Sequence, residues 1–306
     1  MANPLYDPPE VVAAWRERSR TRIGASEAGG AAGVDPYKTP LSIYCAKVCP
    51  VDDEASAAAL WGLADEPAIA RMYERETGEK LLDVQDRSHP KHAFMGASPD
   101  RIWAGNDNGK PRLVQIKSPS EYAPGWGESG TTQIPDVVML QVQQEMEVFD
   151  LDACDVAARI GKTDLRIFTI KRDAALISPL IEIECELWGR IARKQPPEPD
   201  WNHPATFALI GKLNEPKNGL AIDLPEDCLP IVLALSEAKA AVKEHGEAAD
   251  EMKARLIHAM GEASIGRVGG FELVRTKRHR KAYSVAETDY IDFRVKAPKS
   301  ELVSER

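Results

Sequence analysis

The chain has 306 residues, of which 43% are hydrophobic and 28% are charged, with 39 Lys and Arg against 48 Asp and Glu and a formal net charge of -9. A chain of this length and hydrophobic content can bury a full core, so an intrinsically disordered protein is excluded. The acidic excess excludes a protein that coats nucleic acid through uniform positive charge, but not one whose basic contacts are confined to short segments.

Helical and extended patterns alternate over residues 1–194. Ala-rich and amphipathic runs predict helices, and short apolar runs between Pro and Asn-Gly turn signals predict strands. In chain order we expect helices over 9–18, 26–30 and 54–77, the last restarting at Pro67 and stopped by Gly78, then strands over 80–84, 93–96, 101–104 and 113–117, a helix over 135–149, strands over 155–160 and 165–170, and a helix over 174–193. This order predicts the α/β class, with a mixed central sheet flanked by helices.

A Pro-rich break follows in Lys194-Gln-Pro-Pro-Glu-Pro-Asp-Trp201, where prolines remove backbone donors and favour an extended course. Beyond it, a helical pattern spans 226–263, and a hairpin of two strands is expected over 271–276 and 282–295. We therefore predict a main domain over 1–194, a linker over 195–205 and a small α+β appendage over 206–306.

The cellular compartment is indicated by the cysteines and the start of the chain. Five cysteines spread over the whole length differ from the dense, even-numbered framework of small secreted domains. The first residues lack the basic and apolar regions of a signal peptide, and no uninterrupted apolar stretch approaches membrane-spanning length. We therefore expect a cytoplasmic protein with no membrane partner.

The pattern that most strongly indicates chemistry is Ser98-Pro99-Asp100 followed by Gln115-Ile116-Lys117. In a strand, residues two apart share a face, so Gln115 and Lys117 project together. If this strand pairs with the one that ends at Asp100, a carboxylate, an amide and an amine converge. Carboxylate and carbonyl oxygens suit Mg²⁺ or Mn²⁺, and a neighbouring lysine can activate water. These residues alone leave an ordinary surface turn and amphipathic strand as the alternative.

Several other stretches match one family in the same order. They are Arg22-Ile-Gly-Ala-Ser-Glu27, Pro36-Tyr-Lys-Thr-Pro40, Trp61-Gly62 with Glu66-Pro67, the helix 68–78, Ala97-Ser-Pro-Asp-Arg101, the Lys117 strand and Leu140-Gln-Val-Gln143. With these motifs the chain, over about 15–193, resembles the YqaJ-like viral recombinase and phage lambda exonuclease family of the PD-(D/E)xK nucleases. The resemblance implies a restriction-endonuclease-like core.

The resemblance also implies roles for individual residues at the metal site. Asp100, Gln115 and the main-chain carbonyl of Ile116 match metal ligands, Glu66 matches a supporting glutamate, Lys117 the catalytic lysine, and Gln143 a glutamine on the helix beside the active site. Mg²⁺ or Mn²⁺ is the implied cofactor, with two ions expected.

DNA-binding residues are implied in two segments. Ser26 matches the region that holds the 5′-phosphate of the DNA, and the basic partner expected there falls at Ser19 in this chain, which leaves Arg20, Arg22 or Arg18 to take its place. The second segment, 275–281, has five basic residues in seven, including Lys277, Arg278 and Arg280, and is either a solvated hairpin or a phosphate contact.

Position 115 departs from the family pattern, which normally has glutamate there. A neutral amide binds a hard dication less well than a carboxylate, so catalysis is expected to be weakened. Gln115 is either a deliberate inactivating substitution or a natural variant that works with an amide ligand. On this basis Gln115→Glu is expected to raise metal-dependent nuclease activity many-fold, and unchanged activity would contradict the importance of the lost charge.

The function that the resemblance implies is an exodeoxyribonuclease that digests one strand of linear duplex DNA from the 5′ end and leaves a 3′ single strand for phage-type recombination. Its implied partners are double-stranded DNA ends, further copies of itself, with a ring-like trimer among the alternatives, and a phage single-strand annealing protein. A catalytically dead DNA-end-binding recombination protein, another RecB- or Cas4-like nuclease, and an unrelated α/β protein remain open as alternatives.

Overall fold

A mixed sheet of five strands forms the centre of the first part of the chain. Its strands run in the order β2 (Leu81–Leu82), β5 (Arg101–Trp103), β6 (Arg112–Lys117), β7 (Ala153–Ile160) and β8 (Asp164–Lys171). β6 and β7 are parallel, whereas the other neighbours are antiparallel. The computed structural model describes residues 5–48, 56–106, 109–217 and 219–279. Contacts divide the chain into two units, 1–213 and 214–306, each described by itself.

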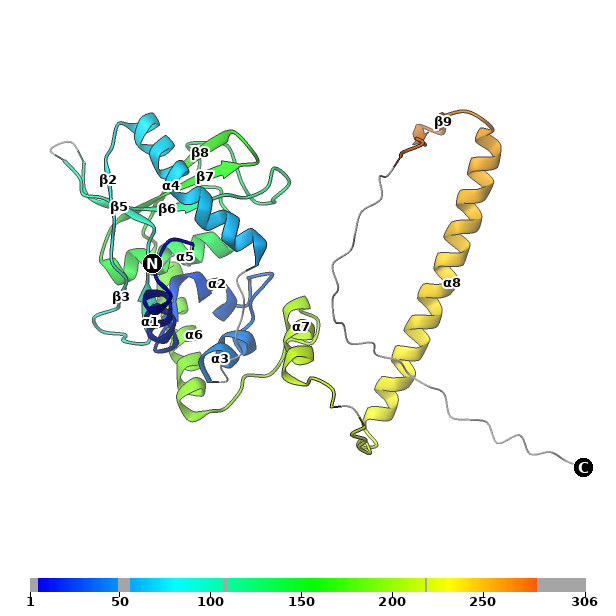
Figure 1. Cartoon of the computed structure of the whole chain (residues 1–306), viewed down its shortest axis with the longest axis horizontal. Helices are drawn as coiled ribbons and strands as arrows, with labels where there is room; N and C mark the ends of the chain where they lie inside the picture. Colours follow the sequence, from blue (N-terminus) through cyan, green and yellow to red (C-terminus); the bar gives the residue numbers. More distant parts are fainter. Residues whose placement is uncertain (1–4, 49–55, 107–108, 218, 280–306) are drawn as a thin grey trace, which may run out of the picture. The chain divides into compact units, whose positions relative to one another are not determined.

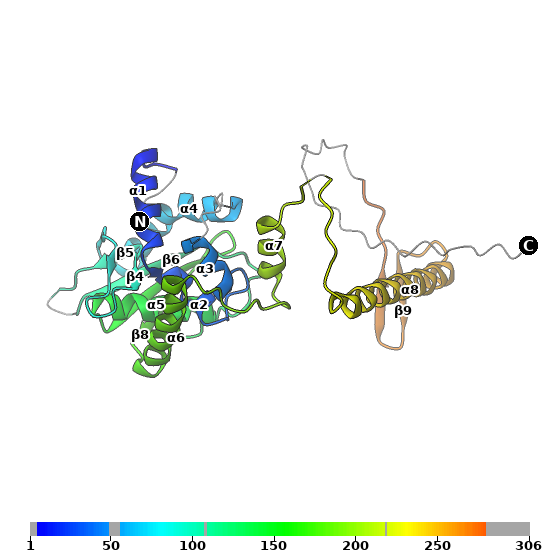
Figure 2. The same ribbon diagram turned by 90° about the horizontal axis from the view of Figure 1, so that it is seen from below.

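Helices cover both faces of this sheet, because its central strands are apolar on both sides (Figures 1 and 2). On one face, Ile69 and Tyr73 of α4 (Ala57–Thr77) pack against Val114 and Ile116 of β6. On the other face, the alternate residue Leu113 packs beneath α5 (Asp136–Phe149). β6 therefore presents its odd-numbered residues to α5. The predicted α/β class, with a mixed sheet flanked by helices, is confirmed.

Most of the remaining elements of the first unit lie on the α5 side of this core. The remaining elements are α1 (Pro9–Arg20), η1 (Ala25–Glu27), α2 (Ala28–Ala31), α3 (Pro40–Val48), α6 (Ala174–Arg193) and α7 (Pro204–Leu213), with a second sheet in the order β1 (Ile23–Gly24), β4 (Met95–Ala97), β3 (Arg87–Ser88). The sequence prediction did not include α3, α7, β1 or β3. The two strands are too short for periodicity to reveal, but α3 had a signal, since the Thr39 and Ser42 hydroxyls each accept from the other's backbone N–H.

Two predicted boundaries differ in the structure. α4 continues through Pro67 without a restart, because the helix is held on both sides of it by burial and by its Ser56 cap, and it ends at the left-handed Gly78 as predicted. The division between units falls after Leu213 and not within the Pro-rich stretch 195–205. The reason is that α7 packs through Leu209 against the cluster that joins α3 to α6.

The second unit contains α8 (Cys228–Met260) and a hairpin of β9 (Ile265–Val268) with β10 (Phe271–Val274). The predicted hairpin used 271–276 as its first strand, whereas the structure makes β10 its second strand. Gly269 and Gly270 both have positive φ, which suits a two-residue turn between right-twisted strands. The predicted strand 282–295 lies outside the described residues. None of the helices described in the structure is both long and apolar enough to cross a membrane.

A buried ion-pair network fixes the α4 face of the sheet. The Asp155 carboxylate on β7 is 2% exposed and accepts hydrogen bonds from Tyr73 Oη at 2.5 Å, Arg112 Nε at 2.7 Å and Thr169 Oγ1 at 2.7 Å. Asp155→Ala is expected to lower the free energy of unfolding by about 3 kcal/mol, because Arg112 Nε and Thr169 Oγ1 lose the buried carboxylate that accepts their hydrogen bonds. Urea unfolding followed by far-UV circular dichroism measures this loss.

The matched control is Glu79→Ala, which removes the other acidic partner of Arg112, at 2.5 Å. The Glu79 side chain is 20% exposed, against 2% for Asp155, so its loss is expected to cost about 1 kcal/mol or less. Equal losses for the two variants would contradict the view that burial, and not the count of ion pairs, determines the contribution of Asp155.

Candidate active site

Antiparallel pairing of β5 with β6 brings Asp100 to Gln115. Arg101 lies opposite Val114, so the residue before β5 falls beside the end of β6. Asp100 Oδ2 accepts hydrogen bonds from Gln115 Nε2 and from the Ile116 backbone N–H, both at 2.7 Å. The carboxylate, the amide and the 115–117 backbone that were expected to converge are therefore in direct contact.

Lys117 reaches the site from the same face of β6 and contacts α5. Its Nζ donates to Gln141 Oε1 at 2.8 Å, and Gln141 Nε2 donates to Glu145 Oε1 at 2.9 Å. Gln141 and Glu145 are four residues apart and so share a face of the helix. Neither residue was predicted from the sequence, although their spacing on a predicted helix was a signal that the two polar groups share one face.

Gln143, in contrast, does not lie in the site. Its Nε2 donates to the Lys171 carbonyl at 2.9 Å, and its Oε1 accepts from the Asp173 backbone N–H at 2.8 Å, next to the start of α6. Residues two positions apart in an α-helix point in directions that differ by about 200° around the helix axis. The face that carries Gln141 toward Lys117 therefore turns Gln143 toward the end of β8, so the structure does not bring Gln143 together with Asp100, and its role beside the active site stays a prediction.

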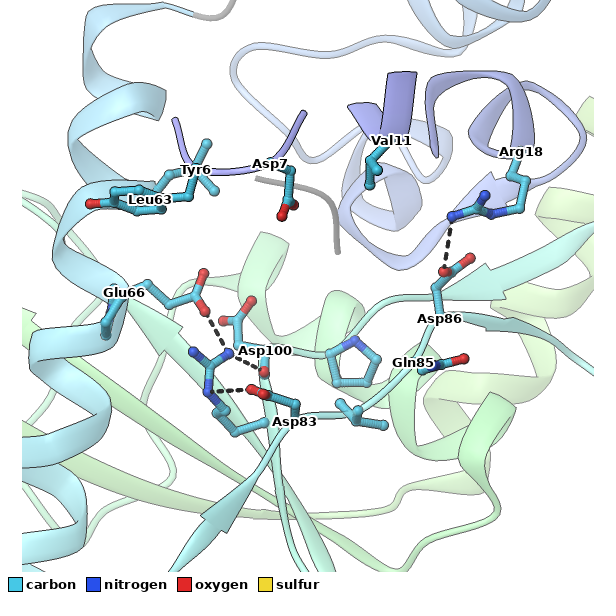
Figure 3. Close-up of a pocket in the computed structure, with 14 residues that line it drawn as sticks. Tyr6, Asp7, Val11, Arg18, Leu63, Glu66, Asp83, Gln85, Asp86 and Asp100 are labelled. Carbon is cyan, nitrogen blue, oxygen red and sulfur yellow. Dashed lines mark hydrogen bonds and ion pairs between the residues drawn. The ribbon is translucent and has the colours of Figure 1, made fainter. Parts of the chain in front are cut away.

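Glu66 on α4 lines the same cavity as Asp100. Figure 3 shows the carboxylates of Glu66 and Asp100 pointing toward one another. The Arg101 guanidinium donates to Glu66 Oε1 at 2.6 Å and to the Asp100 carbonyl at 2.5 Å. The cavity has a volume of about 570 Å³ and is mainly acidic. Its charged lining residues are Asp7, Glu66, Asp83, Asp86 and Asp100 against Arg18 and Arg101. Phosphate would be repelled here unless cations were bound.

Burial and mutual repulsion shift the acid–base equilibria of two carboxyl groups. Burial, and next the charge of Glu66, raise the pKa of Asp100 to about 6, although Lys117 opposes the shift. Burial, and next the charge of Asp100, raise the pKa of Glu145 to about 8, opposed by the Gln141 hydrogen bond and Lys117. A cation near these groups would stabilise their ionised forms.

The residues present fit a hard divalent cation. Gln115 Oε1 and Glu145 Oε2 are buried without a hydrogen-bond partner, and both are oxygens of the kind that Mg²⁺ and Mn²⁺ prefer. In the part of the chain that the structure describes, no three His, Cys, Asp or Glu side chains are grouped to hold a metal ion. A site here therefore needs neutral oxygens, such as the Gln115 amide, beside its carboxylates.

The residues expected at the 5′-phosphate are divided between two places. Arg22 pairs with Asp86 and donates to Ser88 Oγ at 3.1 Å, while Arg18 approaches the same Asp86 at 3.6 Å and lines the acidic cavity. Arg20 instead pairs with Glu17 at 2.6 Å within α1. The structure thus brings Arg18 and Arg22 together around one carboxylate and turns Arg20 elsewhere.

Ser26 is exposed in η1, and its carbonyl accepts a hydrogen bond from Lys38 Nζ at 2.9 Å. Lys38 was not among the predicted residues. In the second unit, Lys277 and Arg278 are exposed in the segment after β10, whereas Arg280 lies outside the described residues. Their role as phosphate contacts stays a prediction.

The raised pKa values predict how stability depends on pH without metal. Between the usual carboxyl pKa of about 4 and the folded values of about 6 for Asp100 and 8 for Glu145, the folded state holds more protons than the unfolded state. Stability should therefore fall as pH rises from about 4.5 to 8, by a few kcal/mol. Melting temperatures measured in EDTA across this range test it.

Glu145→Gln should make this fall shallower, because an amide has no proton to lose in this range, and Mn²⁺ should do the same by stabilising the ionised groups. A melting temperature in EDTA that increased steadily from pH 5 to pH 8 would contradict the assignment of these shifts.

Comparison with known proteins identifies the family to which the first half of the chain is related. Residues 14–152 match the YqaJ-like viral recombinase domain. The uncharacterised protein YqaJ of Bacillus subtilis (strain 168) is 26% identical over 264 residues, which are 84% of this chain and 81% of that protein. These matches confirm the resemblance that the sequence motifs indicate.

Two solved structures are also similar to this chain. An alkaline exonuclease from Laribacter hongkongensis, LHK-Exo, has 19% identity and a TM-score of 0.45, over 66% of this chain and 97% of that chain. A phage-related exonuclease from Haemophilus somnus 129PT has 12% identity and a TM-score of 0.39, over 65% of this chain and 100% of that chain.

Proposed function

Because residues 14–152 carry the YqaJ-like viral recombinase domain, we propose that this chain is a nuclease of the lambda exonuclease type. Its reaction is metal-dependent hydrolysis of one strand of linear duplex DNA from the 5′ end, which leaves a 3′ single strand for phage-type recombination. The observation that carries this proposal is the buried contact of Asp100 with Gln115 and the 116 peptide, with Lys117 beside them.

The metal ligands proposed within this group are oxygens of three kinds. The Asp100 carboxylate, the Gln115 amide oxygen and the Ile116 carbonyl would hold Mg²⁺ or Mn²⁺, and Glu66, in the same cavity, would support a second ion. A bound divalent ion supplies charge that polarises the scissile phosphate and acidifies water. In an acidic cavity of this kind it also offsets the repulsion between the lining carboxylates and DNA phosphate.

Lys117 is proposed as the catalytic lysine because its amine is both anchored and directed at the reacting centre. The Gln141 amide oxygen holds Nζ at 2.8 Å, which restricts the flexible side chain. From this position the ammonium group can donate to the attacking water and to the phosphate oxygen on which charge develops. Arg101 holds Glu66 and the Asp100 carbonyl together and so fixes the spacing of the two acids.

The test uses linear duplex DNA labelled at the 5′ end of one strand or at its 3′ end, with a 5′-phosphate or a 5′-hydroxyl, in Mg²⁺ or in EDTA. The proposed activity releases the 5′ label first, needs Mg²⁺, favours the 5′-phosphate, and spares a covalently closed circle. Nicking of the circle would indicate an endonuclease. Retention of the DNA without loss of label would indicate the DNA-end-binding alternative.

Oligomerisation and a partner protein belong to the same proposal. The resemblance supports a homo-oligomer, such as a ring-like trimer that encloses the duplex, and transfer of the 3′ strand to a phage single-strand annealing protein. Mass measured by light scattering, with and without a duplex end, tests the first, because a monomer on DNA would contradict enclosure by a ring.

A further inference from the structure

Gln115 is used mainly to orient Asp100. Its Nε2 donates to Asp100 Oδ2 at 2.7 Å, so the donor end of the amide is occupied and only Oε1 is available to a cation. The sheet therefore offers one carboxylate and neutral oxygens. Hard dications in proteins are commonly held by more than one negative charge, so the sheet by itself makes a weak site.

Glu145 brings a second carboxylate toward this group from the helical layer, through the Gln141 side chain that also holds Lys117. It is 1% exposed on the face of α5 that covers the odd-numbered residues of β6, where Gln141 links it to Lys117. Gln141 binds Glu145 Oε1, whereas Glu145 Oε2 is buried with no partner. The Asp100 carboxylate lies close enough for its negative charge to raise the pKa of Glu145.

A purely structural role does not account for this side chain. Its neighbour Gln144 shows what such a role requires, since the Gln144 amide bridges the Ile23 and Gly96 carbonyls at 3.1 Å each and ties α5 to the smaller sheet. Glu145 has no comparable bridge to a backbone. Burying a carboxyl group with one unpaired oxygen is costly, and a cation beside Asp100 would give that oxygen a partner.

We propose that Glu145 supplies the second carboxylate of the divalent-metal site and stands in for the glutamate that position 115 lacks. The charge has thus moved from strand β6 to helix α5, while Gln115 keeps Asp100 in position. This inference rests on the proposed function, because it assigns a ligand to the metal that the nuclease needs.

The proposal changes the expected result of Gln115→Glu. If a ligand charge had simply been lost, restoring it would raise nuclease activity many-fold. If Glu145 already supplies that charge, the single substitution adds a third carboxylate beside Asp100 and removes the amide donor that orients it. A many-fold gain in activity for Gln115→Glu alone would therefore overturn the proposal.

The decisive experiment measures Mn²⁺ binding directly, by electron paramagnetic resonance of the free ion, for the full chain and three variants. Glu145→Gln is expected to weaken binding by at least about tenfold to 100-fold, the range found when even a residue that supports a metal ligand is lost. The double variant Gln115→Glu/Glu145→Gln has the same composition and net charge as the wild type, and it is expected to regain most of the affinity.

The matched control is Glu184→Gln on α6. Glu184 is fully buried with neither carboxylate oxygen hydrogen-bonded, but the charges that act on it are those of Glu27 and Lys47, away from Asp100. Its substitution removes a buried carboxyl group and should leave Mn²⁺ affinity unchanged. Thermal unfolding of each variant shows that the protein is folded when binding is measured.

Two Mn²⁺-binding results would also overturn the assignment of Glu145 and leave the proposed function intact. They are Mn²⁺ binding to Glu145→Gln that equals the wild type, and a double variant that binds no better than Glu145→Gln. In both cases the wild type still binds Mn²⁺ and degrades linear duplex DNA. A folded wild type that neither binds Mn²⁺ nor degrades DNA would overturn the proposed function together with this inference.

Discussion

Replacing Asp100 with Asn is expected to reduce metal-dependent degradation of linear duplex DNA by about 10³-fold or more, because it removes the carboxylate around which the proposed site is built. The same change should leave the metal-free protein as stable as the wild type at pH 5 and more stable at pH 8. Burial raises the Asp100 pKa to about 6, so ionisation of this group opposes folding above that pH, and an amide carries no such cost.

The opposite signs of these two effects distinguish a functional carboxylate from a structural one. Initial rates of nucleotide release and melting temperatures at the two pH values measure them on the same preparations. Asp83→Asn is the matched control, since Asp83 lines the same cavity but its side chain is 95% exposed. If Asp100→Asn lost stability at pH 8 as well as activity, its carboxylate would be needed mainly for folding.

Lys117→Met is expected to lower the rate of DNA hydrolysis by about 10²–10⁴-fold, the usual contribution of a positioned acid–base group. Methionine keeps the apolar stem of the side chain but not the amine that donates to Gln141. Because Lys117 is proposed to act on water and phosphate and is not a metal ligand, Mn²⁺ affinity should be retained. This separates Lys117→Met from Asp100→Asn, for which both activity and affinity fall.

Single-turnover degradation of an end-labelled duplex and Mn²⁺ titration check the prediction for Lys117. Lys110→Met is the control, since Lys110 is 86% exposed and pairs with an exposed aspartate at 3.4 Å. Hydrolysis at the wild-type rate by Lys117→Met would show that this lysine has no role in catalysis and would contradict the proposed site.

The sequence predicted well those features that depend on local periodicity. Alternation along β6 placed Gln115 and Lys117 on one face, and α6 begins and ends where its pattern does. α4 ends at Gly78 as expected, because a left-handed residue ends the helix and glycine adopts that conformation readily. Short elements failed for the converse reason: β1 and β3 have two residues each and so contain less than one period of any pattern.

For the candidate site, too, one part could be predicted from the sequence and another part could not. The contact of Asp100 with the 115–117 strand follows from the pairing of two strands separated by a turn, which the sequence determined by itself. Which residues of α5 face Lys117 was decided by the tertiary structure. The helix has several polar positions, and only its packing against the sheet selects the face with Gln141 and Glu145 over the one with Gln143. Helix periodicity fixes which residues share a face, but the buried contacts of Leu113 and its neighbours fix which face is turned inward.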